Sequence, residues 1–478
     1  MSYISFDFFF FVAATLLVYY IAPLKARPYV LLAASLFFYA ASGLENLAAL
    51  VLLIAVTYLC TMLLEKLKKG RAALLTVYIL LTVGGLLFVK FINYILGLSA
   101  RFLNGPALTL EVLVPLGLSF FTLQAIGYAV DVYRGDVQAE RNPLKLALFL
   151  SFFPLVVQGP ISRMRQLSPT LFHGNRFSYK NLTHGAQLML WGLFLKLVIA
   201  NRAATFADPV FTNYSAYSGL TVVLAVLLYT LQLYADFSGC VCICRGVSQM
   251  LGVELMDNFD TPYFAASIRD FWRRWHISLS SWLRDYVYIP LGGSKKGRLR
   301  KYTNLLLTFF VSGIWHGVGV HYIAWGLYHG VLQIIGDVTA PMKKRLRERM
   351  RLREESILYR LFRQLITFVL VAYGWLLFRA DGLIAAIRMT GSIFRDFVSL
   401  GQLQTVFANK AEFCLLLLCT LLLLLTSLLR RRIQLRERIA GLRIWIRWPL
   451  YLALFFAVVL FGGLGEAFSD SIFLYMQF

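Results

Sequence analysis

The chain has 478 residues, of which 59% are hydrophobic, and a formal net charge of +23. Soluble globular domains are about half apolar, so this composition, with a mean hydropathy of +0.68, indicates a membrane protein with several spans. The positive charge gathers in short connectors between apolar runs, and this distribution disfavours nucleic-acid binding.

Seven apolar runs approach the length of about 20 residues that a helix needs to cross a bilayer. The first run follows the acidic Asp7 in place of a basic segment, so we expect it to remain as a span and not to be cleaved as a signal peptide. The runs are Phe8–Leu24, Ala48–Leu64, Leu74–Val89, Leu220–Tyr234, Leu361–Phe378, Phe413–Leu429 and Leu450–Leu464.

The basic connectors predict the orientation of the chain, because Lys and Arg favour cytoplasmic loops. Lys25 and Arg27 follow the first run, which places the N-terminus outside the membrane. With the N-terminus outside, counting the spans also places the basic connector EKLKKGR at 65–71 on the cytoplasmic side. Two connectors therefore agree on a multi-pass protein with an external N-terminus.

We expect one membrane domain over 1–478, with simple spans at 1–105 and 355–478 and a functional core at 110–335. The apolar runs of the core are interrupted by Pro, Gly and polar residues. Broken helices are tolerated at membrane depth only where they are buried in protein or line a wet cavity. The core is therefore predicted to contain a polar cavity, and Pro154 with Pro160 indicates a re-entrant turn.

Residues 257–286 hold the clearest local signals. Ser267 followed by Asp270 is a capping box, which predicts a helix from near Ile268. Apolar residues recur along it at three- and four-residue steps, and arginines lie off this stripe, as in helices that lie in a membrane interface. The stripe is Ile268, Phe271, Trp272, Trp275, Leu279, Trp282 and Tyr286, and the arginines are Arg269, Arg273, Arg274 and Arg284.

His316, in the segment SGIWHG, is a titratable group in strongly apolar surroundings. Desolvation lowers the pKa of an imidazole, so it would be neutral and able to accept a proton as a general base. The alternative is a core histidine bonded to a backbone carbonyl. His276, on the predicted interfacial helix, is either an interface residue or a second functional histidine.

Asp236 ends an apolar run, where it would either N-cap the next segment or orient a catalytic imidazole or bind a polar substrate group. Cys240, Cys242 and Cys244 form a C-x-C-x-C cluster without the second pair that zinc sites usually need, so we interpret them as buried or lipid-modified thiols and expect no metal. The sequence has no nucleophile elbow, phosphate-binding loop or HExxH motif, which disfavours covalent serine catalysis and ATP hydrolysis.

Six stretches of the sequence form a recognisable set. They are PLGLSFFTLQAIGYAVDVYRG (115–135), QGPISR (158–163), DFSG (236–239), the segment from NFDTPYF to YIPLGG (258–293), SGIWHG (312–317) and the chain end FLYMQF (473–478). The FWRRWHISLS…WLRDY…YIPLGG string is the most specific of them. Together these stretches resemble the membrane-bound O-acyltransferase family, and within it the bacterial alginate O-acetylase branch.

The resemblance implies an all-α, polytopic fold of about 11 transmembrane helices, with re-entrant and interfacial helices, in a ring around a central tunnel. His316 matches the family's signature histidine and His276 the second histidine, at the cytoplasmic mouth. Further residues within or beside the matching motifs are expected to support the histidines or bind substrate. They are Asp236, Ser238, Asn258, Arg273, Arg274 and Trp315.

The implied reaction is O-acylation in the cytoplasmic membrane of a bacterium. An acyl group, most simply acetyl, passes from a cytoplasmic thioester, acetyl-CoA or an acyl carrier protein, to a hydroxyl of an extracellular or cell-wall polysaccharide. An extracytoplasmic acetyltransferase is an expected partner, and no bound cofactor is expected. Arg273, Arg274 and Arg284 suit the phosphates of the donor, or alternatively anionic lipid.

One departure leaves the acceptor and donor open. After DFSG the acetylase branch usually continues with a Tyr-Ser-Asp-Met-like run, whereas this chain has CVCICRG at 240–246. D-alanyl transfer from a carrier protein to teichoic acid is the main alternative. A transporter or flippase would show inverted sequence halves, which we do not find, and the presence of both histidines argues against a non-catalytic scaffold.

Overall fold

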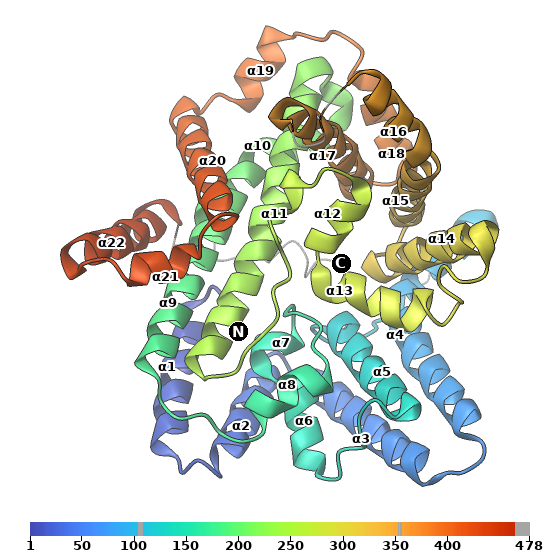
Figure 1. Cartoon of the computed structure of the whole chain (residues 1–478), viewed down its shortest axis with the longest axis vertical. Helices are drawn as coiled ribbons and strands as arrows, with labels where there is room; N and C mark the ends of the chain where they lie inside the picture. The colour runs from blue at the N-terminus through green and yellow to red at the C-terminus, as the bar shows by residue number, and fades with distance from the viewer. Residues whose placement is uncertain (104–108, 352, 354–355, 464–478) are drawn as a thin grey trace. The chain divides into compact units, whose positions relative to one another are not determined.

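The computed structural model describes residues 1–103, 109–351, 353 and 356–463 (Figure 1). In this part of the chain the secondary structure is helical, apart from one isolated antiparallel bridge between Phe259 and Trp275. The predicted all-α class is confirmed. The matching chain end FLYMQF lies outside the described residues.

Seven helices or continuous helical stretches of the described chain are long and apolar enough to cross a membrane. Six of the seven predicted runs overlap them, the last over its described residues, whereas the first run overlaps α1 (Phe6–Ile21), a shorter apolar helix. The seventh stretch, Tyr179–Thr212, was not predicted, because Lys196 and Arg202 interrupt its apolar sequence. Multiple spans are thus confirmed, while the expected total of about 11, the ring and the tunnel stay predictions.

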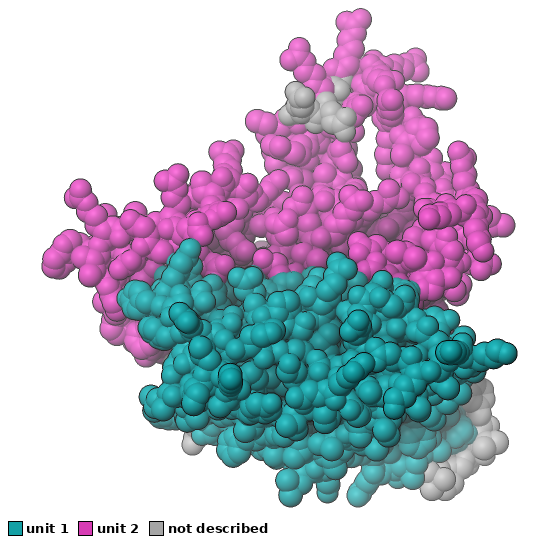
Figure 2. All heavy atoms as spheres, turned by 60° about the horizontal axis from the view of Figure 1, so that its bottom comes forward, with its two compact units in different colours: residues 1–193, 240–256, 472–478 teal, residues 194–239, 257–471 magenta. Residues whose placement is uncertain are grey.

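The described residues cluster into two compact units, shown in two colours in Figure 2. Residues 1–193 and 240–256 form the first, and residues 194–239 and 257–463 form the second. The single domain expected from the sequence stays a prediction. The residues expected to form the site all belong to the second unit.

The first unit consists of apolar helices joined by short connectors. Tyr3 donates a hydrogen bond to the carbonyl of Phe153 across 2.9 Å, and Gln124 donates to the carbonyl of Phe149 across 2.7 Å, so buried polar groups tie the helices together. Its helices are α1, α2 (Arg27–Ala40), α3 (Leu44–Lys66), α4 (Arg71–Leu103), α5 (Leu118–Arg134), α6 (Pro143–Ser151), α7 (Phe153–Val156), α8 (Met164–Leu171), α9 (Tyr179–Leu193) and the last turns of α11.

The helix break predicted around Pro154 is present. The α6 helix ends at Ser151, α7 is a single turn with Pro154 near its start, and the segment 157–163, which is buried up to Ser162, is not α-helical. Proline suits the first turn of a helix because it lacks the N–H that would be unsatisfied there. A re-entrant path through a membrane stays a prediction.

The second unit holds the remaining helices. They are the π-helical η1 (Phe194–Ala200), α10 (Asn201–Thr212), η2 (Tyr214–Ala216), α11 (Gly219–Met250), η3 (Pro262–Phe264), α12 (Ile268–Arg274), α13 (Ile277–Leu283), the π-helical η4 (Arg284–Tyr288), α14 (Gly297–His316), α15 (Val320–Val338), α16 (Ala340–Arg349), α17 (Ile357–Arg379), α18 (Leu383–Ser392), α19 (Leu400–Val406), α20 (Lys410–Arg430), α21 (Leu435–Ala440) and α22 (Ile444–Phe461).

The α14 and α15 helices pack backbone against backbone at two glycines. A Cβ on Gly313 would lie 2.5 Å from the carbonyl oxygen of Tyr322, and one on Gly326 would lie 2.3 Å from that of Phe309. Any side chain at these positions would force the helices apart. This contact fixes the last turns of α14, which carry His316.

Candidate active site

His316 is the last residue of α14 and is 3% exposed. Its ring Nδ1 lies 2.6 Å from the carbonyl oxygen of Ser312, one turn earlier in the helix. A carbonyl only accepts hydrogen bonds, so Nδ1 carries the proton of this bond. In the neutral imidazole Nε2 is therefore the unprotonated nitrogen, as a general base requires.

The structure shows the carbonyl contact expected of a core histidine, while the role of His316 as a general base stays a prediction. The bond to a backbone carbonyl is the feature of a core histidine, but it uses only Nδ1 and sets the tautomer. Aromatic side chains also pack against the ring, with ring centroids 4.7 Å away for Trp325 and 5.6 Å away for Phe378. These rings restrict the orientation of the imidazole.

His276 lies between α12 and α13 with φ 45° and ψ 55°, in the left-handed region. This conformation cannot continue an α-helix, so the prediction of one helix from Ile268 to Tyr286 is wrong. The cause is a partner distant in sequence. The Asn258 carbonyl accepts from the N–H of Ile277, and its side-chain Oδ1 accepts from the N–H of Ser278 at 2.9 Å, so Asn258 caps α13.

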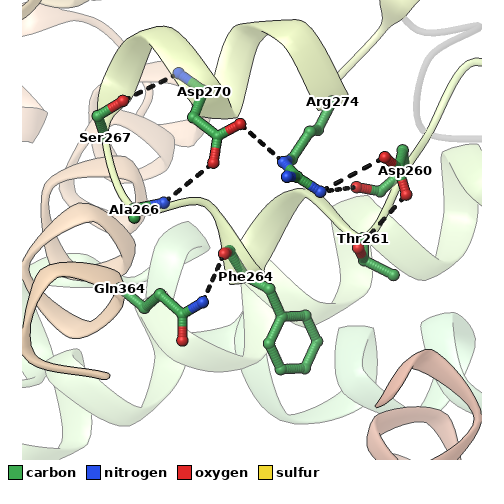
Figure 3. Close-up of polar contacts among 8 residues, drawn as sticks. All are labelled: Asp260, Thr261, Phe264, Ala266, Ser267, Asp270, Arg274 and Gln364. Carbon is green, nitrogen blue, oxygen red and sulfur yellow. Dashed lines mark hydrogen bonds and ion pairs between the residues drawn. The ribbon is translucent and has the colours of Figure 1, made fainter. Parts of the chain in front are cut away.

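The capping box that starts α12 is confirmed, and Figure 3 shows it. Ser267 Oγ accepts from the N–H of Asp270 at 3.1 Å, while the Asp270 carboxylate accepts from the N–H of Ala266. The same carboxylate binds Arg274 at 2.8 Å, and Arg274 also reaches Asp260 at 3.4 Å. These contacts hold α12 and the segment before it in one arrangement.

Trp315 links the two histidines. Its ring centroid lies 6.2 Å from that of His276 and 4.9 Å from that of His316. His276 is fully buried, and Phe237 of α11 packs edge-on against it at 4.8 Å. Burial lowers the pKa of His276 well below its ordinary value, and the nearby His316 lowers it further, so His276 is neutral.

Asp236 lies within α11 and not at a helix start, so the N-cap interpretation is wrong. Its carboxylate forms an ion pair with Lys196 of η1 at 2.5 Å, and the two side chains are 2% and 4% exposed. A buried ion pair on two candidate spans is costly unless its geometry is good. Phe237, which directly follows Asp236 in α11, packs against His276. The ion pair is therefore one residue away from a side chain that contacts His276.

The arginines of this region differ in whether their guanidinium groups form ion pairs with carboxylates of the protein. Arg274 pairs with Asp270 and Asp260, and Arg284 pairs with Asp285 at 2.6 Å. Arg273 is exposed and has neither an ion pair nor a side-chain hydrogen bond within the described residues. Arg273 is therefore the arginine of this set with its guanidinium available to an anionic ligand.

The remaining predicted residues lie in two places. Ser238 is 5% exposed and belongs to α11 in the second unit, two residues after Asp236. The cysteines of the departing segment 240–246 belong to the first unit, where Cys240, Cys242 and Cys244 are buried and unbridged. The Cys240 thiol donates to the side-chain oxygen of Gln158 across 3.3 Å. No group of metal-binding residues occurs in the described chain.

Comparison with known proteins gives the family. The model of the membrane-bound O-acyltransferase family matches residues 139–378, half of the chain, and the match contains every predicted site residue. The chain belongs to the membrane-bound O-acyltransferase family. The expected membership is confirmed, and the multi-pass architecture agrees with it.

Three relatives show how the resemblance is distributed. "Probable alginate O-acetylase AlgI" of Pseudomonas syringae pv. tomato is 38% identical over 344 residues, which cover 70% of this chain but 62% of that protein. The protein of the same name from Pseudomonas putida is 35% identical over 436 residues, covering 88% and 84%. "Teichoic acid D-alanyltransferase" of Bacillus subtilis is 30% identical over 276 residues, covering 55% and 68%. The chain thus spans less than two thirds of the first relative's length.

Sequence reasoning missed Lys196 and the aromatic residues around His316. A lysine inside FLKLVIA is a signal that could have been used, because charges within spans mark functional or paired sites. The roles of Trp325 and Phe378 had no comparable signal, since aromatic residues are common throughout this chain and their contacts with His316 are set by tertiary packing.

Proposed function

We propose that the chain is an O-acyltransferase that moves an acyl group, most simply acetyl, from a cytoplasmic thioester to a hydroxyl of an extracellular or cell-wall polysaccharide. Family membership supports the reaction class, and the alginate O-acetylases among the relatives support the acetyl group and the polysaccharide. The single observation that carries the proposal is the hydrogen bond of His316 Nδ1 to Ser312, because it leaves Nε2 as a base.

In the proposed reaction, Nε2 of His316 takes the proton of the acceptor hydroxyl as its oxygen attacks the thioester carbonyl. The new C–O bond forms, the C–S bond breaks, and the proton on His316 passes to the departing thiolate, which leaves as a thiol. A neutral His276 does not repel the imidazolium formed on His316. We therefore assign His276 to positioning the donor or the acceptor.

The donor is acetyl-CoA or an acyl carrier protein, both of which present a thioester next to phosphate. Arg273 is the residue of α12 with its charge available for such a phosphate, and its exposure suits a ligand that arrives from the aqueous side. On the charge of the connectors, we place the chain in the cytoplasmic membrane of a bacterium with its N-terminus outside. An extracytoplasmic acetyltransferase is the proposed partner for delivery to the polymer.

The test is O-acylation of surface polysaccharide in cells that carry His316→Ala in place of the wild-type chain. We expect ester-linked acyl groups to fall to background at equal protein level, because the base is lost. His321→Ala is the matched control, since His321 lies outside the proposed machinery, and it should acylate normally. Wild-type acylation by His316→Ala at normal expression would overturn the assignment.

D-alanyl transfer to teichoic acid is the second candidate. The relative from Bacillus subtilis favours it, and the departure from the acetylase pattern at 240–246 leaves the acceptor and the donor open. Mild alkaline release of the acyl group from the polymer, followed by mass analysis, distinguishes the two. Acetate supports the first proposal, and D-alanine that disappears with His316→Ala supports the second.

A further inference from the structure

A cavity of about 230 Å³ lies in the first unit, outside the candidate active site and without a role in the proposed reaction. It is formed by the connector before α2, the first turn of α6 and the residues after α8. Three cationic or cation-forming side chains line it, and so do apolar and aromatic groups. They are Lys25, Lys145 and His173 on one hand and Tyr29, Leu144 and Phe172 on the other.

The charge of this cavity is not neutralised by the residues that the structure describes. The side chains of Lys25, Lys145 and His173 have neither an ion pair nor a hydrogen bond among the described residues, and none of the residues that line the cavity is acidic. Lys145 instead lies over the ring of Phe172, with its Nζ 5.5 Å from the ring centroid. Lys25 precedes α2 and Lys145 belongs to the first turn of α6, so two helix dipoles add positive potential.

A neighbouring arginine, by contrast, is fully used to hold the edge of the cavity in place. Arg27 is buried, and its guanidinium donates to the carbonyls of Ala22 at 3.0 Å, Tyr20 at 2.9 Å and Asn175. This clamp joins the connector that carries Lys25 to the loop that carries His173. The edge of the cavity is therefore fixed before any ligand arrives.

The same two segments also touch through their backbones. Gly174, at φ +68°, approaches so closely that a Cβ there would lie 2.3 Å from the carbonyl oxygen of Leu24. Asn175 extends the contact, since its N–H binds the hydroxyl of Tyr19 at 2.9 Å and its side chain donates to the carbonyl of Thr170 at 2.8 Å. The cavity is thus a built site and not a chance gap between mobile lysines.

We propose that this cavity binds a phosphate ester attached to an apolar group. Its lysines supply donors and charge for the phosphate, and the side chains of Tyr29, Leu144 and Phe172 supply the apolar wall. Two sources share this chemistry, the headgroup of an anionic phospholipid and a soluble phosphate ester such as coenzyme A. Tyr29 belongs to the first turn of the apolar helix α2, and both Tyr29 and Leu144 are about half exposed, which favours the phospholipid.

The experiment uses the full chain in phosphatidylcholine nanodiscs that contain a small fraction of photoactivatable phosphatidylglycerol. Crosslinked peptides are identified by mass spectrometry, with and without millimolar coenzyme A. The test variant is Lys25→Gln/Lys145→Gln. The control is Lys68→Gln/Lys69→Gln, which removes the same charge from an exposed connector of the same unit, away from the cavity.

We expect crosslinks at the residues of the cavity, with the same yield in the control as in the wild type. Each lysine near a membrane surface contributes about fivefold to the binding of an anionic lipid, so the loss of both should weaken crosslinking roughly thirtyfold. Insensitivity to coenzyme A identifies the phospholipid as the ligand, and loss of the crosslinks with coenzyme A identifies a soluble phosphate ester. Equal crosslinking in the test variant and the wild type, or an equal loss in the control, overturns the proposal. Should the double variant unfold, Lys25→Gln and Lys145→Gln singly give the same test at about fivefold each.

Discussion

Replacing Lys196 by Met would leave the Asp236 carboxylate buried without its ammonium partner. The two groups are 2.5 Å apart, and their side chains are 4% and 2% exposed, so water cannot take over the lost contact. Removal of one member of a buried ion pair typically costs about 3–5 kcal/mol.

The double variant Lys196→Met/Asp236→Leu separates the missing charge from the altered shape. Exchange of a whole buried pair for apolar groups of similar volume is often neutral or stabilising by about 1–4 kcal/mol, so it should recover most of the loss. Arg202→Met is the matched control in the same candidate span. Its ion pair with Glu412 is 12% and 42% exposed, and its loss should cost no more than about 1 kcal/mol.

The assay is unfolding of the purified protein in detergent, followed by tryptophan fluorescence. A free energy of unfolding of Lys196→Met within about 1 kcal/mol of the wild-type value would refute the reasoning. A double variant Lys196→Met/Asp236→Leu as unstable as Lys196→Met would also refute it, because the loss of stability would then come from packing and not from an unpaired charge.

Three further predictions concern the supports of the site. Asn258→Ala leaves the N–H of Ser278 without its side-chain acceptor and should lower the free energy of unfolding by about 1–3 kcal/mol in the same assay. An unchanged free energy of unfolding would mean that this cap does not hold the turn. The pKa of His276 is lowered by burial, so the unfolded chain binds the proton more readily than the folded chain. The free energy of unfolding should therefore decrease as the pH drops below about 6.5, by up to about 1.4 kcal/mol per pH unit. His276→Asn, which tolerates the left-handed backbone, should show a shallower pH dependence, and an unchanged slope would contradict this. Gly326→Ala places a Cβ 2.3 Å from the carbonyl of Phe309 and should destabilise by about 1–3 kcal/mol, and wild-type stability would disprove the tight contact.

The fold class could be predicted because it rests on compositional signals, whereas the roles of the two histidines stay predictions. Apolar runs identify spans one at a time, and the Ser267 and Asp270 capping box identifies the start of α12 from four residues. The same reasoning failed at His276, because the acceptor groups that start α13 belong to Asn258, 18 residues before His276. A periodic stripe continues through such a break, since the residues on both sides still face the same core.

Residue roles within the site depended on tertiary contacts that no local pattern contains. Asp236 at the end of an apolar run looked like a cap, but α11 continues past it to Met250. Its partner Lys196 lies 40 residues away on η1, so neither sequence neighbourhood shows the pair. Likewise, the tautomer of His316 follows from one distance to Ser312 and from no property of the motif.

The central claim is that Nε2 of His316 accepts the proton of the acceptor hydroxyl. The most direct measurement is the rate of acyl transfer from acetyl-CoA to a soluble hydroxyl acceptor by the purified chain in proteoliposomes, for the wild type and for His316→Ala. The account predicts a loss of about 10²–10⁴-fold, with partial recovery when imidazole is added. A rate within about twofold of the wild type, in a variant that unfolds normally, would contradict it.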